Sequence, residues 1–131
     1  MTKAYKFSVE PGFLNVVCAR EVTAKTMQHF CEKIPKLGRR AGISKILLDK
    51  RNLPISLNTS EYFQCATEIA ENFRGLMLAI VIDPPLTDSQ RFEETVARNR
   101  GASIRLFNAI EEAYEWLGVE PANHPDNHND K

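Results

Sequence analysis

The chain has 131 residues, of which 43% are hydrophobic and 26% are charged. Its 17 lysines and arginines balance 17 aspartates and glutamates, so it lacks the net positive charge of proteins that bind nucleic acids or anionic membranes. No apolar run reaches the roughly 18 residues of a membrane span, and the three cysteines (Cys18, Cys31 and Cys65) do not form the pattern of a disulfide framework. We expect a cytoplasmic protein with one domain over residues 1–118 and a polar, disordered tail over residues 119–131.

The chain opens with the pattern of a β-hairpin. Apolar and polar residues alternate over residues 4–10, which predicts a half-buried strand. Pro11 and Gly12 form a turn signal, and residues 13–19 supply the second strand.

A helix and a buried strand are predicted next. Thr23 is a suitable N-cap for the helix, and Pro35 predicts a kink or a stop in it. Residues 43–48 form a short apolar run that ends at Asp49, which predicts a buried strand. The inward side of the helix has the spacing i, i+3, i+4 and i+7, at Met27, Phe30, Cys31 and Ile34.

A second helix and a central strand follow the same plan. Asn58 and Glu61 have the spacing of a capping box, which predicts the start of the helix. Residues 76–82 are the most apolar run in the chain, and their β-branched content favours a central strand. The predicted inward residues of this helix are Phe63, Ala66, Ile69, Ala70 and Phe73.

The last third of the chain predicts two more helices with a strand between them. Thr87 begins another capping box, for a helix that ends near Arg100. Residues 103–107 form the fifth strand, and Asn108 with Glu111 is predicted to cap the last helix. Its predicted inward residues are Ile110, Ala113, Tyr114 and Leu117.

The elements therefore follow the order ββαβαβαβα. Strands that alternate with helices pair in parallel through right-handed crossovers, while the opening hairpin adds one antiparallel strand. The sequence predicts an α/β fold with a mixed β-sheet and helices packed on it.

The chain offers little catalytic chemistry. It has no glycine-rich phosphate-binding motif, so we expect no nucleotide cofactor. His29 is the only histidine before the tail, and no nucleophile is paired with it at a readable spacing, so we expect no enzymatic activity. His124, Asp126 and His128 lie in the predicted tail, which fixes no coordination geometry, so we expect no metal site.

Charges are unevenly spread along the chain. Residues 32–51 carry seven basic residues against two acids, and residues 111–131 carry six acids against one base. This pattern is that of a polarised surface that steers a protein partner or a second copy of the chain, although two ordinary solvated surfaces explain it as well. No aromatic residue is interleaved with the basic stretch, so nucleic acid is not an expected partner.

The segment from Asp49 to Ser60 is the candidate functional site. A strand ends in an acid, a polar loop follows, and Asn58, Thr59 and Ser60 begin a helix. Backbone N–H groups at a helix N-terminus attract anions, and a phosphate on Thr59 or Ser60 would add about −1.5 to −2 charges there. Plain N-capping explains the same residues without any switch.

The overall pattern resembles the SpoIIAA-like members of the STAS superfamily, over about residues 4–118. The resemblance rests on the element order, on the strand end Ile46–Asp49, and on the strand Ile104–Phe107 followed by Glu112–Leu117. It implies a regulatory or ligand-binding module rather than an enzyme. In the anti-anti-sigma proteins of this group, a serine in an Asp-Ser-Ser/Thr-Gly stretch is phosphorylated to break a protein complex. The matching residues are Asn58–Glu61, with Asn in place of the Asp and Glu in place of the Gly.

Three functional hypotheses follow. The first is a non-enzymatic regulatory module that recognises a protein through the N-terminus of the second helix, with Asp49, Asn58, Thr59 and Ser60 as its site. The second is a binder of an apolar small molecule or lipid between helices and sheet. Some relatives are likened to Sec14-type lipid-binding domains, and Met27, Phe30, Phe63 and Phe73 would line such a pocket. The third, a small hydrolase, would need His29 or Asp49 in an open cleft beside a cysteine or serine.

Overall fold

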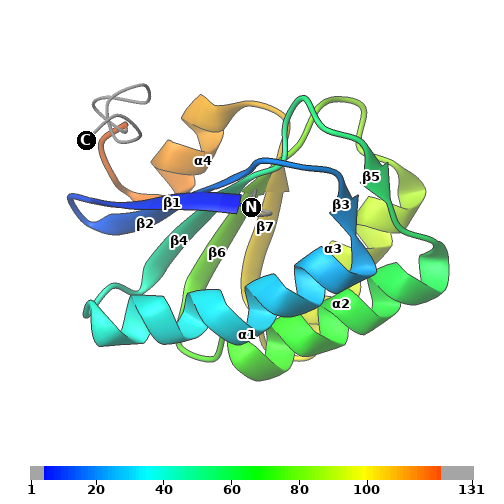
Figure 1. Cartoon of the computed structure of the whole chain (residues 1–131), viewed down its shortest axis with the longest axis horizontal. Helices are drawn as coiled ribbons and strands as arrows, with labels where there is room; N and C mark the ends of the chain where they lie inside the picture. Colours follow the sequence, from blue (N-terminus) through cyan, green and yellow to red (C-terminus); the bar gives the residue numbers. More distant parts are fainter. Residues whose placement is uncertain (1–4, 122–131) are drawn as a thin grey trace.

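The computed structural model describes residues 5–121, which form a five-stranded sheet with helices on both faces (Figure 1). The candidate metal ligands of the tail and residues 122–131 lie outside the described part of the chain. The sheet has the order β1-β2-β4-β6-β7, in which β1 pairs antiparallel with β2 and all other pairs are parallel. Its strands are β1 (Tyr5–Glu10), β2 (Phe13–Cys18), β4 (Lys45–Asp49), β6 (Met77–Val81) and β7 (Ser103–Phe107). The predicted mixed α/β fold is confirmed.

Three of the helices cover one face of the sheet and the fourth covers the other (Figure 1). The first three are α1 (Ala24–Arg40), α2 (Thr59–Asn72) and α3 (Asp88–Asn99), and the fourth is α4 (Ile110–Leu117). Side chains alternate along β4 between these faces: Ile46 and Leu48 join the large core under α1, α2 and α3, and Leu47 joins the small core under α4. All three are fully buried, because a central strand has both faces covered.

Two short strands add to the predicted order. β3 (Val22–Thr23) and β5 (Ile55–Ser56) pair in parallel, and the backbone N–H of Val22 also donates to the carbonyl of Pro54 over 2.9 Å. A pair of two-residue strands has no readable period, so the sequence could not predict it. This pair joins the segment before α1 to the segment before α2.

One predicted helix cap is wrong, and of the kink or stop predicted at Pro35 the stop is excluded. α1 runs through Pro35 to Arg40, so the proline does not stop it. The ring of Pro35 is buried against the core, and this burial offsets the one backbone hydrogen bond that a proline removes. At α4, Asn108 is not the cap: Ala109 takes that position, while the Asn108 amide donates to the carbonyl of Ile82 over 3.2 Å.

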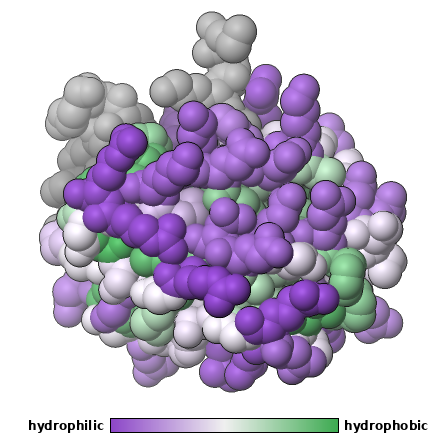
Figure 2. Space-filling view, turned by 90° about the horizontal axis from the view of Figure 1, so that it is seen from below, coloured by the Kyte–Doolittle hydropathy of each residue, from purple (hydrophilic) through white to green (hydrophobic). Residues whose placement is uncertain are grey.

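The outer surface of α1 and α2 is mostly hydrophilic when seen from below (Figure 2). The predicted basic stretch is divided within this fold. Four of its cations (Lys33, Lys36, Arg39 and Arg40) are exposed on α1, while Lys50 is buried and Arg51 is paired with an acid. The exposed acids Glu111, Glu112 and Glu115 belong to α4, across the sheet. Among residues 5–121, no helix is long and apolar enough to cross a membrane.

Candidate functional site

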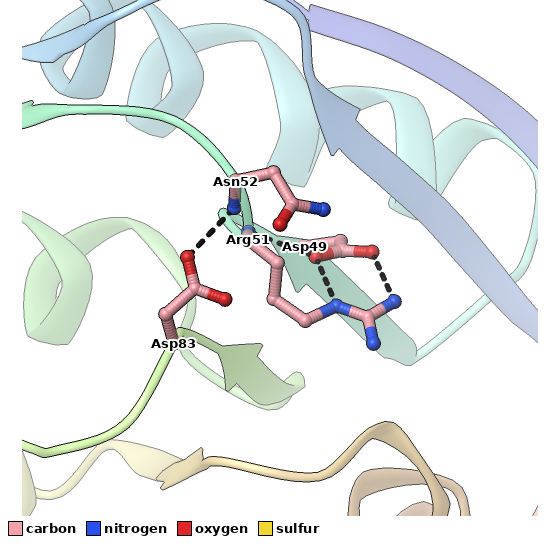
Figure 3. Close-up of polar contacts among 4 residues, drawn as sticks. All are labelled: Asp49, Arg51, Asn52 and Asp83. Carbon is pink, nitrogen blue, oxygen red and sulfur yellow. Dashed lines mark hydrogen bonds and ion pairs between the residues drawn. The ribbon is translucent and has the colours of Figure 1, made fainter.

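Asp49, at the carboxyl end of β4, fastens the loop that leads to α2 (Figure 3). Its Oδ1 accepts from the backbone N–H and the Nε of Arg51, each over 3.0 Å, and its Oδ2 accepts from Arg51 Nη2 over 2.8 Å. This hydrogen-bonded pairing raises the pKa of Arg51. The carboxylate of Asp49 is therefore committed to the loop.

A second contact ties the same loop to the neighbouring strand end (Figure 3). The backbone N–H of Asn52 donates to Asp83 Oδ2 over 2.8 Å, and Asn52 has the positive φ of 67° that asparagine tolerates. The backbone N–H of Lys50 donates to the carbonyl of Val81 over 2.8 Å. The loop after β4 is thus held at Asp49 and at Asn52. These contacts fix the beginning of the segment that leads to α2.

The N-terminus of α2 has the predicted capping box. Asn58 Oδ1 accepts from the backbone N–H of Glu61 over 2.8 Å, and Glu61 Oε1 accepts from the backbone N–H of Asn58 over 2.9 Å. Asn58, Thr59 and Ser60 are all exposed. Asn58 is therefore confirmed as the N-cap, and the two hydroxyls beside it stand on a fixed helical turn that faces solvent.

This helix start lies beside the start of α3. The hydroxyl oxygens of Thr59 and Ser89 are 3.3 Å apart, and α3 begins with its own capping box between Thr87 and Gln90. The structure therefore joins Thr59 to Ser89, while Asp49 is bound to Arg51. Ser89 was absent from the predicted site because the pairing of two helices is a tertiary property, which the sequence of either helix does not contain.

An aromatic pair continues the same surface. The rings of Phe63 and Phe92 stack with centroids 6.2 Å apart and an interplanar angle of 26°, and the guanidinium carbon of Arg100 lies 5.6 Å from the Phe63 centroid. The two phenylalanines are 43% and 40% exposed. The predicted inward position of Phe63 is therefore wrong: α2 turns Tyr62 into the core, and the next residue lies about 100° around the helix. We call Phe63, Phe92 and Arg100 the aromatic patch.

The inner side of the same helix pair contains polar residues. Glu93 of α3 is 1% exposed, and its Oε2 has no hydrogen-bond partner. Burial raises the pKa of Glu93, while the charge of Lys50, which is itself 3% exposed, partly lowers it. Tyr62 and Gln90, which are hydrogen-bonded to each other, are also buried here.

Within residues 5–121, the groups named in the hydrolase hypothesis do not come together in an open cleft. Burial raises the pKa of Cys31 and raises that of Cys65 to about 12, so both thiols stay protonated. His29 is exposed and lies 3.5 Å from the Tyr5 hydroxyl; the described residues that line the groove beside it include no cysteine or serine. Within residues 5–121, no three histidines, cysteines or acids form a cluster that could hold a metal.

Three of the four side chains expected to line an apolar pocket are packed instead, and the fourth, Phe63, belongs to the exposed aromatic patch. Met27, Phe30 and Phe73 are each 2% exposed, and the last two stack with ring centroids 5.5 Å apart. A groove of about 710 Å³ lies outside α1, with polar residues such as Thr26, Gln28 and Glu32 along it. These contacts do not favour an apolar ligand between the helices and the sheet.

No family model and no curated protein sequence matches the chain. Two solved structures match most of it. One is the anti-sigma factor antagonist SpoIIAA in its unphosphorylated form, with 11% sequence identity, a TM-score of 0.54, and coverage of 88% of this chain and 98% of that chain. The other is the Bacillus cell fate determinant SpoIIAA in its phosphorylated form, with 12% identity, a TM-score of 0.51, and coverage of 87% and 99%. The chain therefore has a SpoIIAA-like fold.

Proposed function

We propose that this chain is a non-enzymatic regulatory module that recognises a protein partner through the N-terminal turn of α2. The observation that carries the proposal is the exposed pair of hydroxyls, Thr59 and Ser60, on a capped and anchored helix start. A surface that docks a partner gains from being rigid beforehand, because less conformational freedom is lost on binding. The loop contacts of Asp49 and Asn52 supply that rigidity on the side of β4.

The same turn is suited to regulation by phosphorylation. SpoIIAA itself is known in unphosphorylated and phosphorylated forms. A phosphate on Thr59 or Ser60 would lie at the positive end of the α2 dipole and beside the start of α3, which makes the modified state tolerable for the fold. Its charge of about −1.5 to −2 would change what can dock on a turn whose exposed side chains Thr59 and Ser60 are neutral hydroxyls.

The residues of the turn have different roles in this proposal. Asn58 fixes the backbone, Ser60 is the exposed acceptor of a phosphate, and Thr59 is tied to Ser89. Modification of Thr59 would break its hydroxyl contact with Ser89, whereas modification of Ser60 would leave that contact in place. Asp49 acts at a distance, by holding the loop.

The test compares Ser60→Asp with the uncharged control Ser60→Asn. The two variants and the unaltered chain are each immobilised and exposed to lysate of the protein's own host. The captured proteins are then quantified by mass spectrometry. We expect a partner that binds the unaltered and Asn chains and is depleted about tenfold or more on the Asp chain, a change of about 1.4 kcal/mol. Identical capture by all three chains would contradict the proposal. A native mass spectrum of the protein from its host adds an independent readout, a mass increment of one phosphate.

A further inference from the structure

We infer that the aromatic patch is the anchor of the docking surface, and that it receives an acidic segment of a partner protein in which carboxylates flank an apolar side chain. This inference rests on the proposed function and specifies the chemistry of the partner. Three observations carry it: exposed stacked rings, their position beside the hydroxyls of α2, and arginines that lack a carboxylate partner within the described residues.

The exposure of the two rings is costly for an isolated domain. Phe63 and Phe92 leave 43% and 40% of their surfaces in water, although a buried phenylalanine contributes roughly 1.5–3 kcal/mol. They also lie next to each other, so the apolar surface is continuous. Buried aromatic residues and arginines are the groups that dominate protein–protein binding energies. The patch therefore has the composition of an interface centre.

The patch is continuous with the hydroxyls of the proposed site. Phe63 follows Thr59 by four residues in α2, and Phe92 follows Ser89 by three residues in α3, so each pair lies on one helix face. Thr59 and Ser89 touch across the helices, and one turn further along the two rings do the same. A partner seated on the rings would therefore also reach the N-terminal turn of α2.

The charges around the patch favour an acidic partner. Arg91, Arg98 and Arg100 are all exposed, and none of them forms an ion pair at 4.0 Å or less with a described residue. Two acids of α3 face inward instead: Glu93 is buried, and Glu94 accepts from the backbone N–H of Leu106 over 2.8 Å. Asp88 is the one acid of α3 left on its exposed side. On the exposed side of α3 the three arginines outnumber Asp88, and carboxylates from a partner would complement this local excess of positive charge.

The ring geometry favours a protein over a nucleic-acid strand. Bases bind by stacking on open aromatic faces, and Phe63 is already contacted by the Phe92 ring and the Arg100 guanidinium. The formal net charge of the whole chain is zero, which gives no general attraction for a polyanion. Exposed ring edges instead suit an aliphatic or aromatic side chain that enters between the two helices.

The experiment places a photo-crosslinking phenylalanine analogue (p-benzoyl-phenylalanine) at position 63 in the full chain, expressed in its own host. The control is the same analogue at Lys36, an exposed position on α1. We expect a crosslink at position 63 to a protein segment with Asp or Glu within a few residues of the modified side chain. Its yield should fall about fivefold or more with Arg100→Glu, and should stay unchanged with Lys36→Glu.

Several outcomes would overturn the inference. These are a crosslink yield no higher than at position 36, a neutral or basic crosslinked segment, a second copy of this chain, or a product that nuclease removes. Because the rings are partly exposed, Phe92→Ala should keep the fold, and circular dichroism checks this. The analogue at position 60 separates the two proposals: crosslinks at 60 without any at 63 would defeat this inference and leave the proposed function standing.

Discussion

The chain contains two stacked phenylalanine pairs in opposite surroundings. Phe30 and Phe73 stack at 5.5 Å with an interplanar angle of 23° and are 2% exposed, whereas Phe63 and Phe92 stack at 6.2 Å and 26° and are at least 40% exposed. The ring geometry is therefore similar, and the difference lies in what surrounds the rings. The inner pair stabilises the fold because its rings are buried. The exposed surface of the outer pair can be buried only when another molecule binds to it.

The inner side of the α2–α3 pair shows the opposite departure from the usual pattern, a polar group in the protein interior. Where the outer side has two phenylalanines in water, the inner side has the carboxyl group of Glu93 in the core, with one oxygen unpartnered. A buried polar group without a hydrogen bond costs about 1–3 kcal/mol. The α2–α3 pair thus departs on both sides from the usual arrangement of apolar residues inside and polar residues outside. We place the docking surface on its outer side.

The largest expected effect tests the two ring pairs directly. Phe73→Ala should lower the free energy of unfolding by about 3–5 kcal/mol, because it leaves a cavity in the large core. Phe63→Ala should lower it by less, by about 1.5 kcal/mol, because the ring is 43% exposed and its loss removes the contacts with Phe92 and Arg100 without opening a cavity in the core. Urea unfolding of both variants measures the difference. Equal losses would show that the outer pair is part of the core.

The next effect concerns the pH dependence of stability. Burial raises the pKa of Glu93, so the folded chain retains a proton at pH values where the unfolded carboxyl group has lost it. The free energy of unfolding should therefore fall as pH rises from the ordinary value of 4.5 to the raised value, and below that window the term is constant. Glu93→Gln removes this group, so we expect its free energy of unfolding to rise relative to that of the unaltered chain as pH rises from 4 to 8.

The comparison of two pH values separates ionisation from packing. Any fixed cost of the amide is present wherever Glu93 is neutral and can be recognised at pH 4, whereas the loss of the charge attraction to Lys50 arises only where Glu93 is ionised. Parallel profiles for the unaltered chain and Glu93→Gln would contradict the raised pKa.

The sequence predicted what local pattern determines. The five strands of the main sheet, the four helices and the caps at Thr23, Asn58 and Thr87 are as expected, because alternation and capping are readable within one element. In α2, either Tyr62 or Phe63 could face the core, because they precede the inward residue Ala66 by four and three residues. Only the packing of α3 against α2 decides between them.

The candidate site could be predicted in part, because some of its features also depend on local sequence patterns. Asn58, Thr59 and Ser60 stand out as a helix start in the sequence, and their exposure is a property of that local turn. Asp49 also stands out, as the acid that ends β4, but its role depends on Arg51 folding back onto it. Ser89 and Phe92 carried a weak signal, since on both helices a hydroxyl residue precedes a phenylalanine by about one helical turn. That signal acquires meaning only when the two helices are adjacent.

The smallest expected effect on stability lies at the cap of α2. Asn58→Ala removes the acceptor for the backbone N–H of Glu61 and should cost about 1 kcal/mol, which Asn58→Ser should largely recover. Thermal unfolding of both variants measures this loss. Because Asn58 also fixes the turn that presents Thr59 and Ser60, the alanine variant should lower the crosslink yield at position 60 by more than it lowers the yield at position 63, where Phe92 and Arg100 hold the ring. Equal reduction at both positions would mean that the turn and the aromatic patch respond as one unit, and that the cap supports the whole docking surface.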